Sequence, residues 1–153
     1  MKLFHTSPQQ IETIKNSGVF SGALFFSSDI YYTQQSKDSV IYTIDVEEDQ
    51  FASLYDIDPS QQIIDDIKHM FNALFDQDID DDEAIEYLIE DENIFDQGLD
   101  CECASEFSWF IQGMQAKSAL EQGFIGVESE DEQGTVYIIN MIGKADMLEL
   151  THA

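Results

Sequence analysis

Basic residues are scarce in this sequence. Six Lys and Arg stand against 32 Asp and Glu, which gives a formal net charge of −26 at pH 7. A field of this sign repels nucleic acid and anionic membranes, so direct binding to either is not expected. The same field attracts basic protein surfaces, and it permits mimicry of DNA toward a protein that normally holds DNA. General solubility or halophilic adaptation is the alternative explanation that the charge leaves open.

Cysteines and long apolar segments are also few. Cys101 and Cys103 are the two cysteines, and their C-x-C spacing is too short for an ordinary structural disulfide. No apolar run approaches the ~18 residues that span a bilayer, and the N-terminus lacks the apolar region of a signal peptide. We therefore expect a reduced, cytoplasmic protein.

Familiar motifs for phosphate, acyl transfer and metal binding are missing. The chain contains no P-loop, no G-x-G-x-x-G and no G-x-S-x-G. The acidic run from Asp76 to Glu92 does not fit a calcium loop, because Asp81 stands where glycine is needed and Tyr87 where glutamate is needed. His69 and His152 lack zinc-ligand spacing with the cysteines. We expect no metal, and we interpret the acidic run as a solvated helix face.

The remaining composition predicts a folded α+β domain. Hydrophobic residues make up 43% and aromatic residues 12% of 153 residues, enough for one core. Apolar periodicity predicts strands first, helices in the middle and strands last, a pattern typical of α+β folds. Strands are expected at 3–4, 23–28, 40–46, 124–127, 135–142 and 147–150, and helices at 8–18, at 60–75, from 81 or 82, and from 105 to 123. We expect one domain over 1–153, with a helical acidic middle at about 58–122.

Three stretches are candidates for a binding site. His5 is expected where the backbone leaves the first strand, just before Ser7-Pro8 opens a helix. Phe25 and Phe26 lie on the second strand and Tyr31 just beyond it, so their rings could hold a flat heterocycle or pack in the core. The stretch 128–135 carries four acids within five residues and is expected to be a loop between two strands.

Ordered matches along the chain carry a resemblance to a known family. The matching residues are Leu3-Phe4-His5-Thr6-Ser7-Pro8; Leu24-Phe25-Phe26 with Asp29 and Tyr31; Ser108-Trp109 with Ile111-Gln112 and Ala116-Lys117; Gly123-Phe124-Ile125-Gly126-Val127; and Asp131-Glu132-Gln133-Gly134-Thr135. The chain resembles the H-Y-[E/D] ADP-ribosyltransferases of the diphtheria-toxin and PARP-like group. More closely, it resembles the small anti-CRISPR ADP-ribosyltransferases that inhibit type I-F systems. The region 47–105 carries little of the match.

The resemblance implies an ADP-ribosyltransferase-like fold, with small mixed or antiparallel sheets and flanking helices. It also implies NAD as co-substrate. By this resemblance, His5 and Thr6 hold ribose hydroxyls and the nearby backbone. Tyr31 stacks on nicotinamide, with Phe26 assisting.

The resemblance also implies a catalytic carboxylate. Breaking the nicotinamide–ribose bond builds positive charge on the ribose, which a preorganised carboxylate stabilises. Asp131 takes this role by the family match, with Glu132 as the alternate. Glu128 and Glu130 stay open as further alternatives, because Glu128-x-Glu130 and Glu130-x-Glu132 both have the form E-x-E. The arginine acceptor of E-x-E relatives is not carried over, because those relatives begin with arginine where this chain has His5.

The implied function is that of an NAD-dependent mono-ADP-ribosyltransferase in the bacterial host cytoplasm. Its implied target is the PAM-reading subunit of the type I-F surveillance complex. Such a subunit is basic where it grips DNA, so a protein of charge −26 would be steered to it. The alternative is a non-catalytic acidic inhibitor that imitates DNA. NAD hydrolysis without transfer to protein is a third hypothesis.

Overall fold

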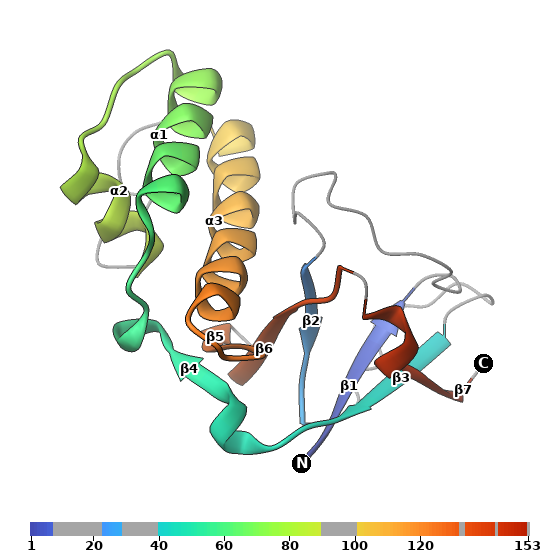
Figure 1. Ribbon diagram of the computed structural model, residues 1–153. Helices are drawn as coiled ribbons and strands as arrows, with labels where there is room; N and C mark the ends of the chain where they lie inside the picture. The colour runs from blue at the N-terminus through green and yellow to red at the C-terminus, as the bar shows by residue number, and fades with distance from the viewer. Residues whose placement is uncertain (8–22, 29–39, 90–100, 132–133, 143, 153) are drawn as a thin grey trace.

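The fold comprises two small sheets and a helical layer (Figure 1). The structure, a computed structural model, describes residues 1–7, 23–28, 40–89, 101–131, 134–142 and 144–152. Within them the strands are β1 (Lys2–Ser7), β2 (Ala23–Phe26), β3 (Val40–Asp45), β4 (Phe51–Ser53), β5 (Gly126–Asp131), β6 (Gly134–Asn140) and β7 (Glu149–His152). The helices are α1 (Gln61–Phe75), α2 (Asp81–Leu88) and α3 (Cys101–Glu121), with short 3₁₀ turns at Glu48–Gln50, Leu54–Asp56 and Ala145–Met147.

Each sheet combines strands from the beginning and the end of the chain. The three-stranded sheet has the order β1-β3-β7 and is antiparallel. The four-stranded sheet has the order β2-β6-β5-β4, in which β4 and β5 run parallel and the other pairs antiparallel. The late strands thus return to pair with early ones, and the predicted α+β class is confirmed.

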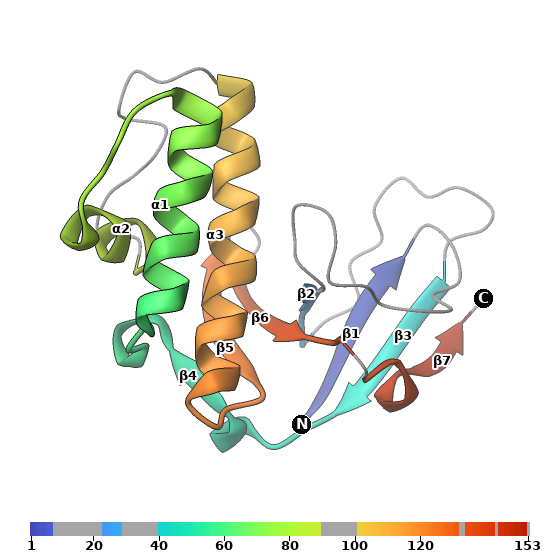
Figure 2. The same cartoon turned by 45° about the horizontal axis from the view of Figure 1, so that its top comes forward.

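The four-stranded sheet separates two cores (Figures 1 and 2). Its helical side contributes Ala23, Phe25 and Ile138 to a core shared with α1, α2 and α3. Its other side contributes Phe26 and Ile139 to a core shared with the three-stranded sheet. Alternate residues of β2 therefore pack on opposite sides, as its continuous apolar sequence predicts.

The helix starts follow from local capping. The Ser60 Oγ accepts a hydrogen bond from the Ile63 N–H at 3.4 Å at the start of α1. The Asp80 Oδ1 accepts one from the Glu83 N–H at 2.8 Å at the start of α2. Acids in the first turn of α2 face the positive end of its dipole, as expected for a solvated acidic helix. Asp81 also pairs with the Lys68 Nζ at 2.9 Å, which ties α2 to α1.

Several predicted boundaries were wrong. The helix α3 begins at Cys101, four residues before Ser105, because Ala104 is already buried in the helical core. Strand β4 was not predicted, since its three residues are held only by parallel pairing with β5. The acidic stretch 128–131 is not a loop but the second half of β5, paired with β6. Alternation explains this, because Val127 and Ser129 are buried while Glu128 is exposed.

The first strand also differs from the prediction. Strand β1 runs to Ser7, so His5 lies within the sheet opposite Tyr42 and does not mark the exit from it. Ser7 is the last residue of the strand, opposite Val40. The helix predicted at 8–18 lies outside the described residues.

Gly126, one of the residues that carry the family resemblance, lies where β5 and β6 approach too closely for a side chain. A Cβ built on Gly126 clashes with the carbonyl oxygen of Ile138 on β6 and lies 3.0 Å from the Ile139 Cγ1. Backbone cannot yield as a flexible side chain can, so Gly126→Ala must push β5 away from β6. We expect this substitution to cost about 2–3 kcal/mol in the free energy of unfolding. Thermal denaturation measures it, and a melting temperature equal to that of the wild type would contradict this packing.

Candidate functional site

His5 lies where the two sheets meet. The Phe4 N–H donates to the Ser27 carbonyl at 2.8 Å and the Ser27 N–H donates to the Phe4 carbonyl at 3.0 Å, which joins β1 to the end of β2. The His5 Nδ1 lies 2.8 Å from the Phe25 carbonyl oxygen. The rings of His5 and Phe26 lie 5.6 Å apart at 50°. The strand pairing therefore fixes the backbone of His5, and the Phe25 carbonyl and the Phe26 ring contact its side chain.

The surroundings of His5 set its protonation state. Burial lowers the pKa of His5 below its ordinary value, and the hydrogen bond to the Phe25 carbonyl offsets part of this effect. The ring is therefore neutral at pH 7. A carbonyl oxygen only accepts, so Nδ1 carries the proton and Nε2 keeps a lone pair. His5 can thus accept a hydrogen bond from a ligand hydroxyl.

The other residues predicted to bind NAD are placed to different extents. Phe26 is only 1% exposed and packs among Leu3, Tyr137 and Ile139. In this position its ring supports His5 from the core side. The backbone of Thr6 follows His5 in β1 opposite Ile41. Tyr31 lies outside the described residues. The structure thus brings His5 and Phe26 together.

The predicted catalytic carboxylate Asp131 lies at the end of β5. Asp131 is the last residue of β5, and its backbone pairs with Gly134 of β6. Glu132 lies outside the described residues. Gly134 lies three residues before Tyr137 in β6, and Tyr137 pairs with Phe26 of β2. The backbone of Asp131 is therefore roughly 10 Å along the strands from the row of Phe26, toward the end of β2 from which the chain continues to Tyr31.

Glu128 lies nearer the row of Phe26 and His5 than Asp131 does. It pairs with Tyr137, which in turn pairs with Phe26. Burial raises the pKa of the Tyr137 hydroxyl, and the negative charges of Glu128 and Glu48 raise it further. Sequence reasoning did not single out Tyr137, because a tyrosine within an apolar strand has no distinguishing signal.

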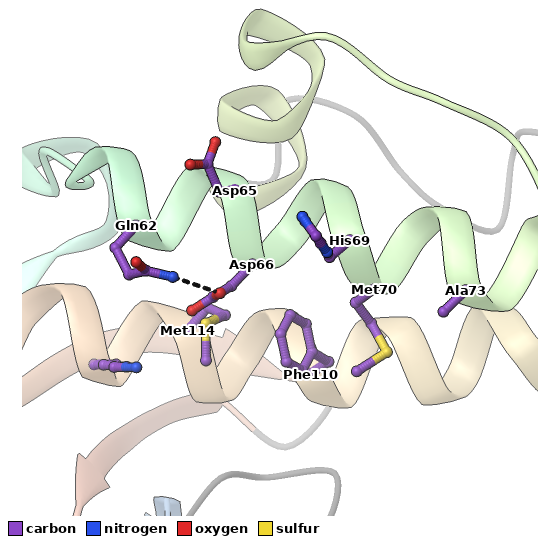
Figure 3. A pocket seen from close by; sticks show the side chains of 9 residues that line it. Gln62, Asp65, Asp66, His69, Met70, Ala73, Phe110 and Met114 are labelled. Carbon is purple, nitrogen blue, oxygen red and sulfur yellow. Dashed lines mark hydrogen bonds between the residues drawn. The ribbon is translucent and has the colours of Figure 1, made fainter.

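Two surface grooves lie on the helices, away from His5. One of about 690 Å³ lies between α1 and α3 (Figure 3). The other, of about 410 Å³, is lined by Lys68, His69, Asn72, Asp78 and Ile79. Among the described residues, no three His, Cys, Asp or Glu side chains are grouped so as to hold a metal ion. Nor does any helix in these residues have the length and apolarity to cross a membrane.

The lowered pKa of His5 predicts a pH dependence of stability. The unfolded chain takes up a proton at His5 near pH ~6.5, whereas the native chain resists protonation to a lower pH. The unfolded state therefore binds more protons in this window, and native stability falls as the pH falls from 6.5 to the lowered pKa of His5. His5→Gln should lack this component. Urea unfolding of both proteins from pH 8 to pH 5 measures the difference, and parallel curves would contradict a buried neutral His5.

The chain is similar to one protein family and to a solved structure. The family model described as Anti-CRISPR Type I-F ADP-ribosyltransferase AcrIF11 matches residues 1–145. A solved structure described as "Crystal structure of an anti-CRISPR protein" aligns with a TM-score of 0.52 and 23% sequence identity, covering 91% of this chain and 88% of that chain. At this identity the likeness supports the fold alone. No curated protein matches the chain.

Proposed function

Because the chain belongs to the type I-F anti-CRISPR ADP-ribosyltransferase family AcrIF11, we propose that it transfers one ADP-ribose from NAD to a subunit of a type I-F surveillance complex. The protein is an ADP-ribosyltransferase, and enzymes of this class take ADP-ribose from NAD. The observation that carries the proposal is the family match over residues 1–145, which includes both His5 and Asp131. We also propose that residues 1–153 form a single domain.

The geometry around His5 supports a role in holding NAD. NAD supplies a ribose whose hydroxyls can donate hydrogen bonds. The neutral His5 ring offers Nε2 as an acceptor, and its Nδ1–H is directed at the Phe25 carbonyl, so the ring cannot rotate freely. Phe26 keeps the ring in place from the core side. We propose that Thr6 and Tyr31 complete this wall, Thr6 at the ribose and Tyr31 on nicotinamide.

Asp131 is the proposed catalytic carboxylate. A negative group beside the ribose stabilises the positive charge that develops there as the bond to nicotinamide breaks. Asp131 ends a paired strand, so its backbone is held by the hairpin. Glu132 is the alternate. Glu128 pairs with Tyr137, in the same row as Phe26, and stays open as a further alternative together with Glu130.

Charge supports the proposed target, which is the PAM-recognising subunit of the complex. A subunit that grips DNA presents a basic surface, and the net charge of −26 attracts such a surface over long range. We propose that the encounter occurs in the cytoplasm of the bacterial host.

The same charge favours a second candidate function, that of an acidic inhibitor that occupies a DNA site without chemistry. The two functions differ in stoichiometry and in their need for NAD. DNA binding by the purified type I-F complex can be measured after incubation with this chain, with and without NAD. Loss of binding that requires NAD and occurs with far less than one chain per complex supports the enzyme. Loss without NAD, and only at one chain or more per complex, supports the mimic.

A further inference from the structure

The groove between α1 and α3 has a mixed lining of charge and apolar surface (Figure 3). Met70 and Ala73 of α1 supply its accessible apolar part, and Phe110 and Met114 of α3 also line it, although they are core residues only 8% and 3% exposed. Asp65 and Asp66 of α1 supply two carboxylates. Its volume of about 690 Å³ lies within the ~300–1,000 Å³ that is typical of ligand-binding clefts. We call this feature the α1–α3 groove.

The two carboxylates are held in place by neighbouring amides. The Gln61 Nε2 donates to the Asp65 Oδ1 at 2.9 Å, and the Gln62 Nε2 donates to the Asp66 Oδ1 at 2.8 Å, the bond drawn in Figure 3. Each pair is spaced i, i+4 on one helix, where side chains are neighbours. Neutral amides orient the carboxylates without cancelling their charge.

Two lysines lie near these carboxylates: the pKa of Lys68 is raised first by its hydrogen bond to Asp81, and the charge of Asp65 raises it further. Lys117 of α3 also lines the groove. In the part of the chain that the structure describes, the ion pairs are Met1–Asp45 and Lys68–Asp81, so neither groove aspartate has a cation within 4.0 Å. The groove thus combines a limited apolar surface and two oriented acids with a histidine and a lysine, in a protein whose net charge is −26.

We propose that the α1–α3 groove docks a basic, amphipathic segment of the target protein, at a place separate from the NAD site. Apolar side chains of the segment contact Met70 and Ala73, beside the largely buried Phe110 and Met114. Flanking Lys or Arg side chains of the segment meet Asp65 and Asp66. Methionine side chains adapt to varied apolar partners. Nucleic acid does not fit, because its phosphates are repelled by the acids. A second copy of this chain carries the same strong negative charge and is repelled too.

This inference rests on the proposed function for the identity of the partner. The four-stranded sheet lies between the helical layer and the sheet that holds His5 (Figures 1 and 2). A segment in the groove would therefore hold the target without touching NAD. Loss of the contact between the segment and the groove should raise KM for the target. It should leave kcat and the hydrolysis of NAD unchanged.

The first test compares two double substitutions that remove the same charge. Asp65→Asn with Asp66→Asn neutralises the groove, and Asp82→Asn with Glu83→Gln neutralises two exposed acids on α2 outside its lining. We expect the groove variant to raise KM for the type I-F complex about tenfold or more over the α2 variant. Nicotinamide release from NAD alone should match the wild type in both. Equal KM values in the two variants would overturn the proposal.

The second test does not depend on catalysis. A photoreactive benzoylphenylalanine replaces Ala73, which lines the groove, or Tyr55, which is 81% exposed outside it. After irradiation with the purified type I-F complex, the Ala73 position should crosslink to a protein segment rich in Lys or Arg, and the Tyr55 position should not. Equal crosslinking from both positions, crosslinking to guide RNA, or crosslinking to a second copy would overturn the proposal. A wild type that transfers no ADP-ribose would defeat the proposed function, and the crosslink would still test the groove.

Discussion

Asp131→Asn should reduce ADP-ribose transfer at least a hundredfold while the protein stays folded. The substitution keeps the size of the side chain and removes its charge. Removing one group that stabilises a charged transition state costs on the order of 10²–10³ in rate. Asp131 is the last residue of β5, at the end of a hairpin, so the core should tolerate the change. The rate of transfer to the type I-F complex measures the effect.

Neighbouring acids provide matched controls for Asp131. Glu128→Gln and Glu130→Gln remove the same unit of charge from the same strand. They should keep most of the activity, because the proposed charge beside the ribose comes from Asp131. Glu132→Gln tests the alternate carboxylate. Full activity in Asp131→Asn together with loss in Glu132→Gln would assign the catalytic role to Glu132.

Phe107→Ala should cause the largest loss of stability among single substitutions in the helical core. Phe107 is fully buried, and its ring meets those of Phe71, Phe75 and Tyr87 edge-on at 5.3, 6.0 and 5.5 Å. One side chain thus joins α3 to both α1 and α2. Deletion of a buried phenylalanine costs about 3–5 kcal/mol, a large part of the ~5–15 kcal/mol of a typical domain. Urea denaturation measures the loss.

Leu120→Ala is the control on the same helix. Leu120 is 38% exposed near the end of α3, so its truncation should cost about 1 kcal/mol. Similar losses for Phe107→Ala and Leu120→Ala would mean that the aromatic cluster does not hold the three helices together. A large loss for Phe107→Ala with retained NAD-dependent transfer at low temperature would fit a structural role.

Local signals predicted α1 and α2 well. Ser60 as a cap and the spacing of Ile63, Ile67 and Phe71 define α1, and these side chains are buried. Such signals fail where long-range pairing decides. The strand character of 128–131 depends on β6, and the three residues of β4 depend on β5. Neither partner can be identified from the local sequence, and acidic residues ordinarily indicate a loop.

Resemblance identified candidate site residues that spacing alone could not connect. His5 and Asp131 are far apart in the chain, and no local pattern links them. The hydrogen bond that fixes His5 is accepted by the backbone carbonyl of Phe25. Any residue at position 25 has this carbonyl, so the sequence could not predict the bond. The α1–α3 groove was not predicted, because Asp65 and Asp66 have the pattern of an ordinary solvated helix face until α3 packs beside them.

The mass of each subunit of the type I-F complex, after incubation with this protein and NAD, tests the central claim most directly. The proposal predicts that the PAM-recognising subunit gains the mass of one ADP-ribose. The gain should be absent without NAD and strongly reduced with Asp131→Asn. If every subunit keeps its mass while the complex still loses DNA binding, the protein does not act by ADP-ribose transfer.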